Sequence, residues 1–112
     1  MKDLSIDQLC VIGKTNPEIP DKFLYWLRDN KHVWDGFQRE AFKVIRSGRK
    51  HYSAYTIREY LRHETMLREV SDEVYKISNN HTPSLARLFA TVYPEHANLL
   101  SFKTLKVGQE AA

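Results

Sequence analysis

Glycine and cysteine are scarce in this chain, and the motifs of the common catalytic sites are missing. Its four glycines form no glycine-rich phosphate loop, and the GxSxG pattern of a serine nucleophile does not occur. His63 and Glu64 are not followed by the second histidine that a zinc-binding HExxH helix requires. The other histidines have no ligand spacing with cysteine or carboxylate side chains. We therefore expect a protein that is not an enzyme and that uses neither a metal nor another cofactor.

Cys10 is the only cysteine, which excludes a disulfide within the chain and is typical of a reducing compartment. Its neighbours Leu9, Val11 and Ile12 are apolar, so Cys10 is expected to be a small buried side chain. No stretch approaches the roughly 18 consecutive apolar residues of a membrane span. Residues 1–9 also lack the apolar run of a signal peptide. These features predict a soluble, cytoplasmic protein.

The 112 residues are 42% hydrophobic, which is enough for one packed core and too little for two. No repeat, linker or low-complexity tract divides them. We expect a mainly α fold, with five helices and a short β excursion in a single domain over residues 1–107. Residues 1–30 would form N-terminal helices and residues 31–96 a core of helix-turn-helix or winged-helix type. Residues 108–112 would be a frayed tail.

Local signals define the first three expected helices. Ser5 and Gln8 have the spacing of a capping box, and Gly13 would end that helix. Pro20 suits the first position of a second helix. A third helix is indicated by an apolar stripe at helical spacing and would end at Gly48. The stripe consists of Val33, Phe37, Ala41, Val44 and Ile45.

A fourth helix is expected over residues 54–65, with Ser53 as its cap. At 100 degrees per residue, Tyr55, Arg58 and Arg62 would share an outward face. Glu59 would border this face, so the face is not purely basic. No local feature accounts for this group. It is therefore the strongest functional candidate within the basic part of the chain.

Thr82 followed by Pro83 predicts the start of a fifth helix, and Pro94 predicts its end. Residues 66–78, which precede this helix, break the helical period and predict a brief hairpin. The alternation over residues 100–102 indicates a strand, with a terminal helix as the alternative. The polar side chains expected to face outward from the fifth helix are Ser84, Arg87 and Thr91.

The positive excess is confined to one short stretch. Residues 1–45 carry seven Lys or Arg against seven Asp or Glu, residues 46–62 carry five against one, and residues 63–112 carry five against six. Tyr52, Tyr55 and Tyr60 lie between these cations. A local basic patch with interspersed tyrosines is typical of a surface for an anionic partner, and nucleic acid is the leading candidate.

A helix-turn-helix protein places one helix in the major groove of double-stranded DNA, commonly as a homodimer. If the fifth helix is this reader, residues 79 and 80 lie at its amino end. If the fourth helix is the reader, residues 48–53 form the turn and residues 70–77 part of a wing; the charge excess favours this assignment. The candidate nucleic-acid contacts are Arg49, Lys50, Tyr52, Tyr55, Arg58, Arg62, Asn79, Asn80 and Arg87.

Two other interpretations remain open. The helix dipole favours cations at a carboxyl end by about 0.3–1 kcal/mol each, which would account for Arg46, Arg49 and Lys50 without a partner.

Alternatively, the chain is a protein-binding module, for instance an inhibitor or adaptor that docks on a host or phage protein. Aromatic residues are enriched at such interfaces. The interface candidates are Phe23, Tyr25 and Trp26.

Residues 34–96 carry a set of recognisable motifs. They contain W-x2-F-x3-A from Trp34, GRKHYSAYTI-x3-LRHET from Gly48, NN-x-TP-x2-ARLF from Asn79 and YPEH from Tyr93. This pattern, above all GRKHYSA-x-TI-x3-LR, resembles a group of small proteins carried by bacteriophages and prophages. The resemblance implies a phage or mobile-element setting, where small helical proteins are commonly DNA-binding regulators or inhibitors of host enzymes. The resemblance therefore supports the DNA-binding and the protein-binding interpretations equally.

Overall fold

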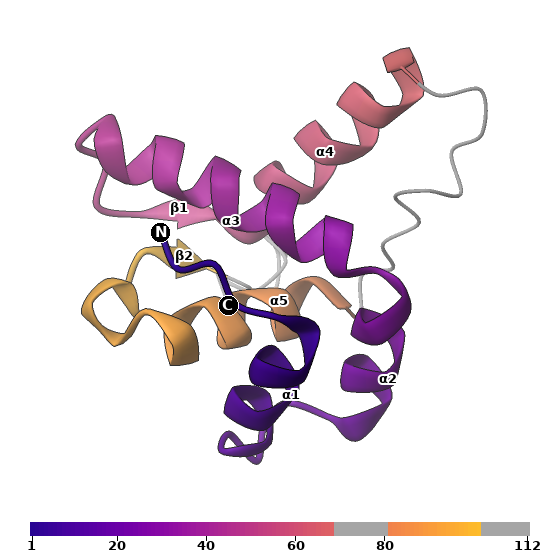
Figure 1. Cartoon of the computed structure of the whole chain (residues 1–112). Coiled ribbons are helices and arrows are strands. Elements are labelled where there is room, and N and C mark those ends of the chain that lie inside the picture. Colours follow the sequence, from indigo (N-terminus) through magenta and orange to yellow (C-terminus); the bar gives the residue numbers. More distant parts are fainter. Residues whose placement is uncertain (69–80, 102–112) are drawn as a thin grey trace, which may run out of the picture.

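The computed structural model describes residues 1–68 and 81–101 of the chain (Figure 1). Helices dominate these ranges, which confirms the predicted mainly α fold with five helices. The elements are α1 (Ile6–Lys14), α2 (Asp21–Asp29), α3 (Lys31–Arg46), β1 (Tyr52–Ser53), α4 (Ala54–Arg68), α5 (His81–Val92), the 3-10 helix η2 (Pro94–His96) and β2 (Leu100–Ser101). The predicted wing at residues 70–77 and the predicted tail at residues 108–112 lie outside the described residues.

The capping box at the start of α1 is confirmed. The backbone N–H of Gln8 donates to Ser5 Oγ at 3.2 Å, and the backbone N–H of Ser5 donates to Gln8 Oε1 at 2.8 Å. The predicted end of this helix at Gly13 is wrong, because α1 continues to Lys14. Gly13 is buried, and a Cβ there would lie 2.9 Å from Leu24 Cδ2. The glycine therefore permits close packing of α2 on α1 and does not terminate the helix.

The ends of α3 and α4 follow the predicted local signals. Ser47 caps the carboxyl end of α3, and Gly48 then adopts a φ of 86°, a left-handed conformation that favours glycine. At the start of α4, the backbone N–H of Tyr55 donates to Ser53 Oγ at 3.2 Å. Residues 66–68 continue α4, so the predicted hairpin cannot begin there.

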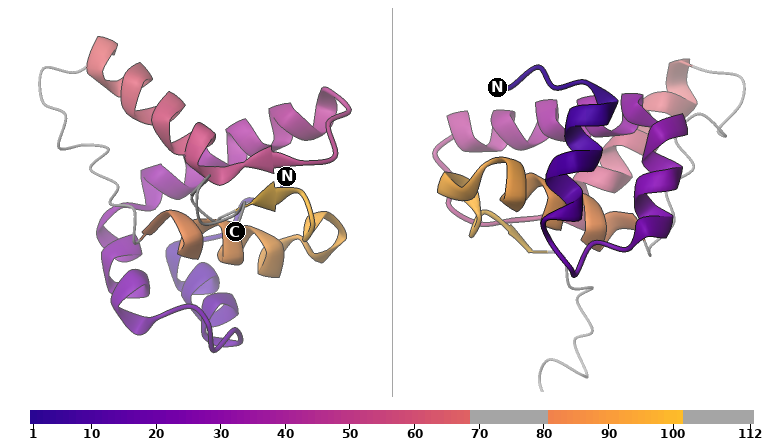
Figure 2. Two further views of the ribbon diagram at one scale, coloured as in Figure 1. Left: turned by 180° about the vertical axis from the view of Figure 1, so that it is seen from behind. Right: turned by 60° about the horizontal axis from the view of Figure 1, so that its bottom comes forward.

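Helix α5 lies between α1 and α2 on one side and α3 and α4 on the other, as the two directions of view in Figures 1 and 2 show. Its apolar residues Leu85, Leu88 and Phe89 are fully buried in the core. The prediction that polar residues of α5 face outward is wrong for Ser84, which is buried. Arg87 faces outward only in part, since it is half-buried. A helix surrounded by neighbours has little outward face.

Strands β1 and β2 pair in parallel, with Tyr52 opposite Leu100. The backbone N–H of Tyr52 donates to the carbonyl oxygen of Leu99 at 2.8 Å. The strand prediction is therefore confirmed at Leu100–Ser101. The predicted end of the fifth helix near Pro94 is also confirmed, since α5 ends at Val92. The connection from α3 to α4 contains β1 and is longer than the three or four residues typical of a helix-turn-helix turn.

Candidate nucleic-acid interface

Three cations project from the carboxyl end of α3, where the chain turns at Gly48. We call Arg46, Arg49 and Lys50 the basic tip; all three side chains are exposed. Among the described residues, none of the three is within ion-pair distance of a carboxylate. The Arg49 guanidinium lies over the ring of Tyr52, 5.8 Å from its centroid. Since β1 anchors Tyr52 to β2, this contact links the tip to the core.

The outward face of α4 is less basic than its sequence indicates. Only 13% of the Arg58 side chain is exposed, and its guanidinium lies over the Tyr55 ring at 5.9 Å from the centroid. Glu59 forms ion pairs with Arg58 and with Arg62, the latter at 3.6 Å. The prediction that Tyr55, Arg58 and Arg62 form an open face without a local role is therefore wrong for Arg58. One carboxylate compensates both arginines.

A groove separates the carboxyl-terminal half of α3 from β1 and the first turns of α4. We call it the α3–α4 groove; it encloses about 410 Å³. Its lining combines apolar, aromatic, hydroxyl and charged side chains. These are Glu40, Lys43, Val44, Ser47, Arg49, Tyr52, Thr56, Ile57 and Tyr60. The groove thus shares Arg49 with the basic tip.

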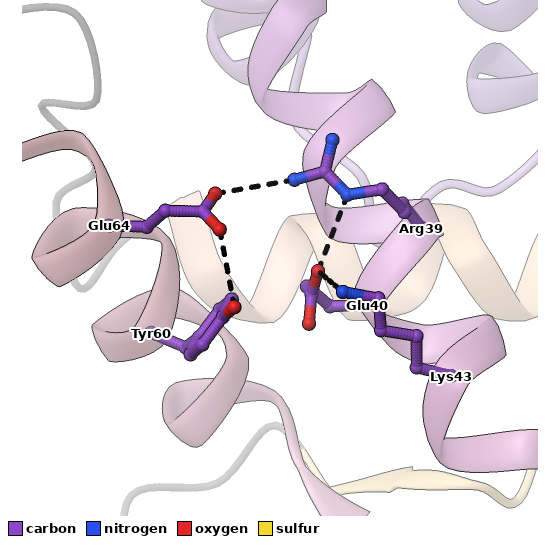
Figure 3. A network of polar contacts seen from close by, with 5 residues as sticks. All are labelled: Arg39, Glu40, Lys43, Tyr60 and Glu64. Atoms are coloured by element: carbon purple, nitrogen blue, oxygen red, sulfur yellow. Dashed lines mark hydrogen bonds and ion pairs between the residues drawn. The ribbon is translucent and has the colours of Figure 1, made fainter. Parts of the chain in front are cut away.

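Glu40 on α3 and Glu64 on α4 belong to one network of polar contacts (Figure 3). Arg39 bridges Glu40 at 3.3 Å and Glu64 at 3.5 Å, and so connects α3 to α4. Lys43 donates to the same Glu40 oxygen at 3.0 Å, and the Tyr60 hydroxyl donates to Glu64 at 3.2 Å. Only 12% of the Glu40 side chain is exposed. The groove therefore has an ion-paired carboxylate, Glu40, at one end, and at the other end Arg49, which forms no ion pair with a carboxylate in the described part of the chain.

The other predicted nucleic-acid contacts do not join this site. Arg87 is half-buried in α5, and Asn79 and Asn80 lie outside the described residues. Lys50 and Arg49 remain exposed at the tip, while Tyr52 is partly buried against the core. The structure thus brings together the cations next to Gly48 and separates them from the amino end of α5.

The aromatic interface predicted on α2 loses one member. Phe23 is only 2% exposed and belongs to the core, so its assignment to an interface is wrong. Trp26 is half-buried and stacks on His81 with 4.3 Å between ring centroids. Burial and the nearby Lys22 lower the pKa of His81. Tyr25, in contrast, is 72% exposed.

Sequence reasoning missed several residues that line the groove. Glu40, Lys43 and Ser47 recur along α3 at three- and four-residue spacing, and Thr56 and Tyr60 do the same on α4. This spacing places each set on one face of its helix. The signal was present in the sequence, but only the packing of α3 against α4 makes the two faces line one groove.

No helix in the described ranges is long and apolar enough to cross a membrane. Within residues 1–68 and 81–101, no group of three or more His, Cys, Asp or Glu side chains could hold a metal ion. No protein-family model, curated protein or solved structure matches the chain. The resemblance to phage-borne proteins therefore stays a prediction.

Proposed function

We propose that this protein is a non-enzymatic DNA-binding protein of the cytoplasm, a regulator of the kind found in phages and mobile elements. One observation carries the proposal. The exposed cations Arg46, Arg49 and Lys50 lie together, and no carboxylate in the described part of the chain neutralises them. An uncompensated cluster of this kind attracts phosphate, because each contact releases counterions from the nucleic acid.

The basic tip replaces α4 as the main phosphate contact in this proposal. Arg58 and Arg62 share Glu59, so together they bring one net positive charge and not two to an anionic partner. The logarithm of affinity changes with that of salt concentration by about −0.9 per neutralised duplex phosphate. The three cations of the tip therefore predict a slope of about −2.7.

Anisotropy of a labelled DNA duplex, titrated between about 50 and 200 mM salt, tests the proposal. The double substitution Arg49→Ala and Lys50→Ala should weaken binding and reduce the slope to about −0.9. Lys14→Ala with Lys22→Ala is the matched control, since it removes the same charge from exposed positions on α1 and α2, away from the tip. The control should retain the slope of the unmodified protein.

Two results would refute DNA binding through the tip. One is the absence of binding by the unmodified protein at about 50 mM salt. The other is an equal loss of slope in the two double variants, because a general effect of net charge would then explain the binding. A thermal melt of each variant checks that the substitutions leave the fold intact.

Docking on a host or phage protein is the second candidate function, and the exposure of Tyr25 favours it. This side chain lies beside a cavity of about 240 Å³ between α1 and α2. Arg28 and Leu24 line the same cavity. Under this proposal Tyr25→Ala abolishes capture of a specific protein from a host lysate without lowering the melting temperature. Capture that Tyr25→Ala does not change would exclude this surface.

A further inference from the structure

We propose that the α3–α4 groove holds one unpaired nucleotide of the strand whose phosphates the basic tip contacts. This inference rests on the proposed DNA binding and extends it: the protein would prefer single-stranded over double-stranded DNA. It is carried by three properties of the groove, namely its size, its aromatic wall and the different polar groups at its two ends.

The groove has the size and lining of a small-ligand site. Its volume of about 410 Å³ falls within the usual range for such pockets, about 300–1,000 Å³. Val44 and Ile57 supply apolar surface, and Tyr60 remains 45% exposed on one wall. Single-stranded nucleic acids stack their bases on exposed aromatic rings of this kind in grooves that also carry cations.

The polar groups at the two ends of the groove match the two ends of a nucleotide. Arg49 lies at the tip end, where its guanidinium can donate to a phosphate. Glu40 precedes Ser47 by about 10 Å along α3 at 1.5 Å per residue. A carboxylate at that distance can accept from the N–H groups of a base. A nucleotide with its phosphate at the tip and its base at Glu40 would therefore form hydrogen bonds at both ends of the groove.

Glu40 also indicates which bases fit. Arg39 and Lys43 both bind its Oε2 atom. We therefore expect the other oxygen, Oε1, to be the acceptor for a ligand. Guanine carries two adjacent N–H donors on its pairing edge, whereas thymine carries one. A carboxylate that accepts from such donors discriminates between bases. We therefore expect guanine to be preferred over thymine in the groove.

Base pairing blocks this mode of binding. In a duplex the bases are stacked and their pairing edges are occupied, so a base must leave the helix before it can enter a pocket. Phosphate contacts alone would instead favour the duplex, because its charge density is higher. The order of affinities for single- and double-stranded DNA thus separates binding in the groove from binding at the tip alone.

The experiment measures the affinity of labelled thymine strands with one central guanine, free or annealed to their complement. The single strand should bind at least about fivefold more tightly than the duplex. Tyr60→Ala should weaken single-strand binding by about 5- to 150-fold, the value of one base stacked on an aromatic ring, and leave duplex binding unchanged. Tyr60→Phe keeps the ring and should keep the affinity. Tyr25→Ala removes an exposed tyrosine from α2 and is the matched control.

Glu40→Gln tests the base preference on its own. The unmodified protein should favour the strand with guanine over an all-thymine strand by at least about fivefold, and the variant should lose this preference. If Tyr60→Ala leaves single-strand binding unchanged, or the duplex binds more tightly, the groove proposal is overturned. DNA binding through the tip then still stands, provided that Arg49→Ala with Lys50→Ala reduces the salt slope. If neither form of DNA binds, both proposals fail.

Discussion

Removing the hydroxyl of Tyr93 should destabilise the fold, because this group satisfies a buried amide. Tyr93 follows α5 and is 2% exposed. Its hydroxyl donates to Gln38 Oε1 on α3 and accepts from the backbone N–H of Lys2 at 2.7 Å. Three segments distant in sequence thus meet at one oxygen atom. Tyr93→Phe breaks both hydrogen bonds and leaves the ring contacts in place.

The size of the effect follows from where the two partners lie. Gln38 is 5% exposed, so its amide oxygen would be buried without a donor, at a cost of about 1–3 kcal/mol. Lys2 is exposed at the chain start, and its N–H can bind water instead. For a domain of this size, about 1 kcal/mol corresponds to a melting temperature about 4 °C lower. Tyr93→Phe should therefore melt about 4–12 °C below the unmodified protein.

Urea denaturation and thermal melts followed by circular dichroism measure this loss. Tyr60→Phe is the matched control, since its hydroxyl binds Glu64 at the surface, and it should change the free energy of unfolding by less than about 0.5 kcal/mol. Combining Tyr93→Phe with Gln38→Met should recover part of the loss, because both partners are then apolar. The reasoning fails if Tyr93→Phe is as stable as Tyr60→Phe.

Three further predictions concern the pH dependence of stability and the turn before β1. Burial lowers the pKa of His81 from 6.5, so the unfolded chain binds a proton at this histidine more readily than the folded protein does. The free energy of unfolding should therefore fall as the pH drops below about 6.5. In urea titrations at several pH values, His81→Phe should reduce this pH dependence. Burial raises the pKa of Tyr93 from 10.0, so stability should also fall as the pH rises above that value, and less so in Tyr93→Phe. Gly48→Ala should lower the free energy of unfolding by about 1 kcal/mol in chemical denaturation, because Gly48 has a φ of 86°. Gly48→Asn should lower it less. Equal stability of the unmodified protein and both variants would contradict the argument.

Features that depend on neighbours in sequence could be predicted from it. The capping box of Ser5 and Gln8 and the turn at Gly48 are set by side chains and backbone within a few residues. Gly13 was misassigned because the same residue type serves two purposes. Only the position of Leu24, on another helix, shows that Gly13 provides space for packing.

The candidate site was only partly predictable, because it depends on side-chain conformations as well as on contacts between segments that are distant in sequence. Helical periodicity gives the direction of Arg58 around α4, but it does not reveal that the side chain lies over Tyr55 and pairs with Glu59. The α3–α4 groove is formed by α3, α4 and β1, and β1 is paired with β2 from the far end of the described chain. Tyr52 and Leu100 are far apart in sequence, and no local pattern connects them.

The arrangement of the basic tip also limits how far the helix dipole can account for it. The effect of the dipole is confined to about the last turn, which contains Lys43 and Arg46. Arg49 and Lys50 follow Gly48, where the positive φ turns the chain away from the helix axis. Instead, Arg49 lies over Tyr52, against the strand pair. The dipole therefore gives a sufficient reason for Arg46 and none for the other two, and these are the cations whose removal tests DNA binding.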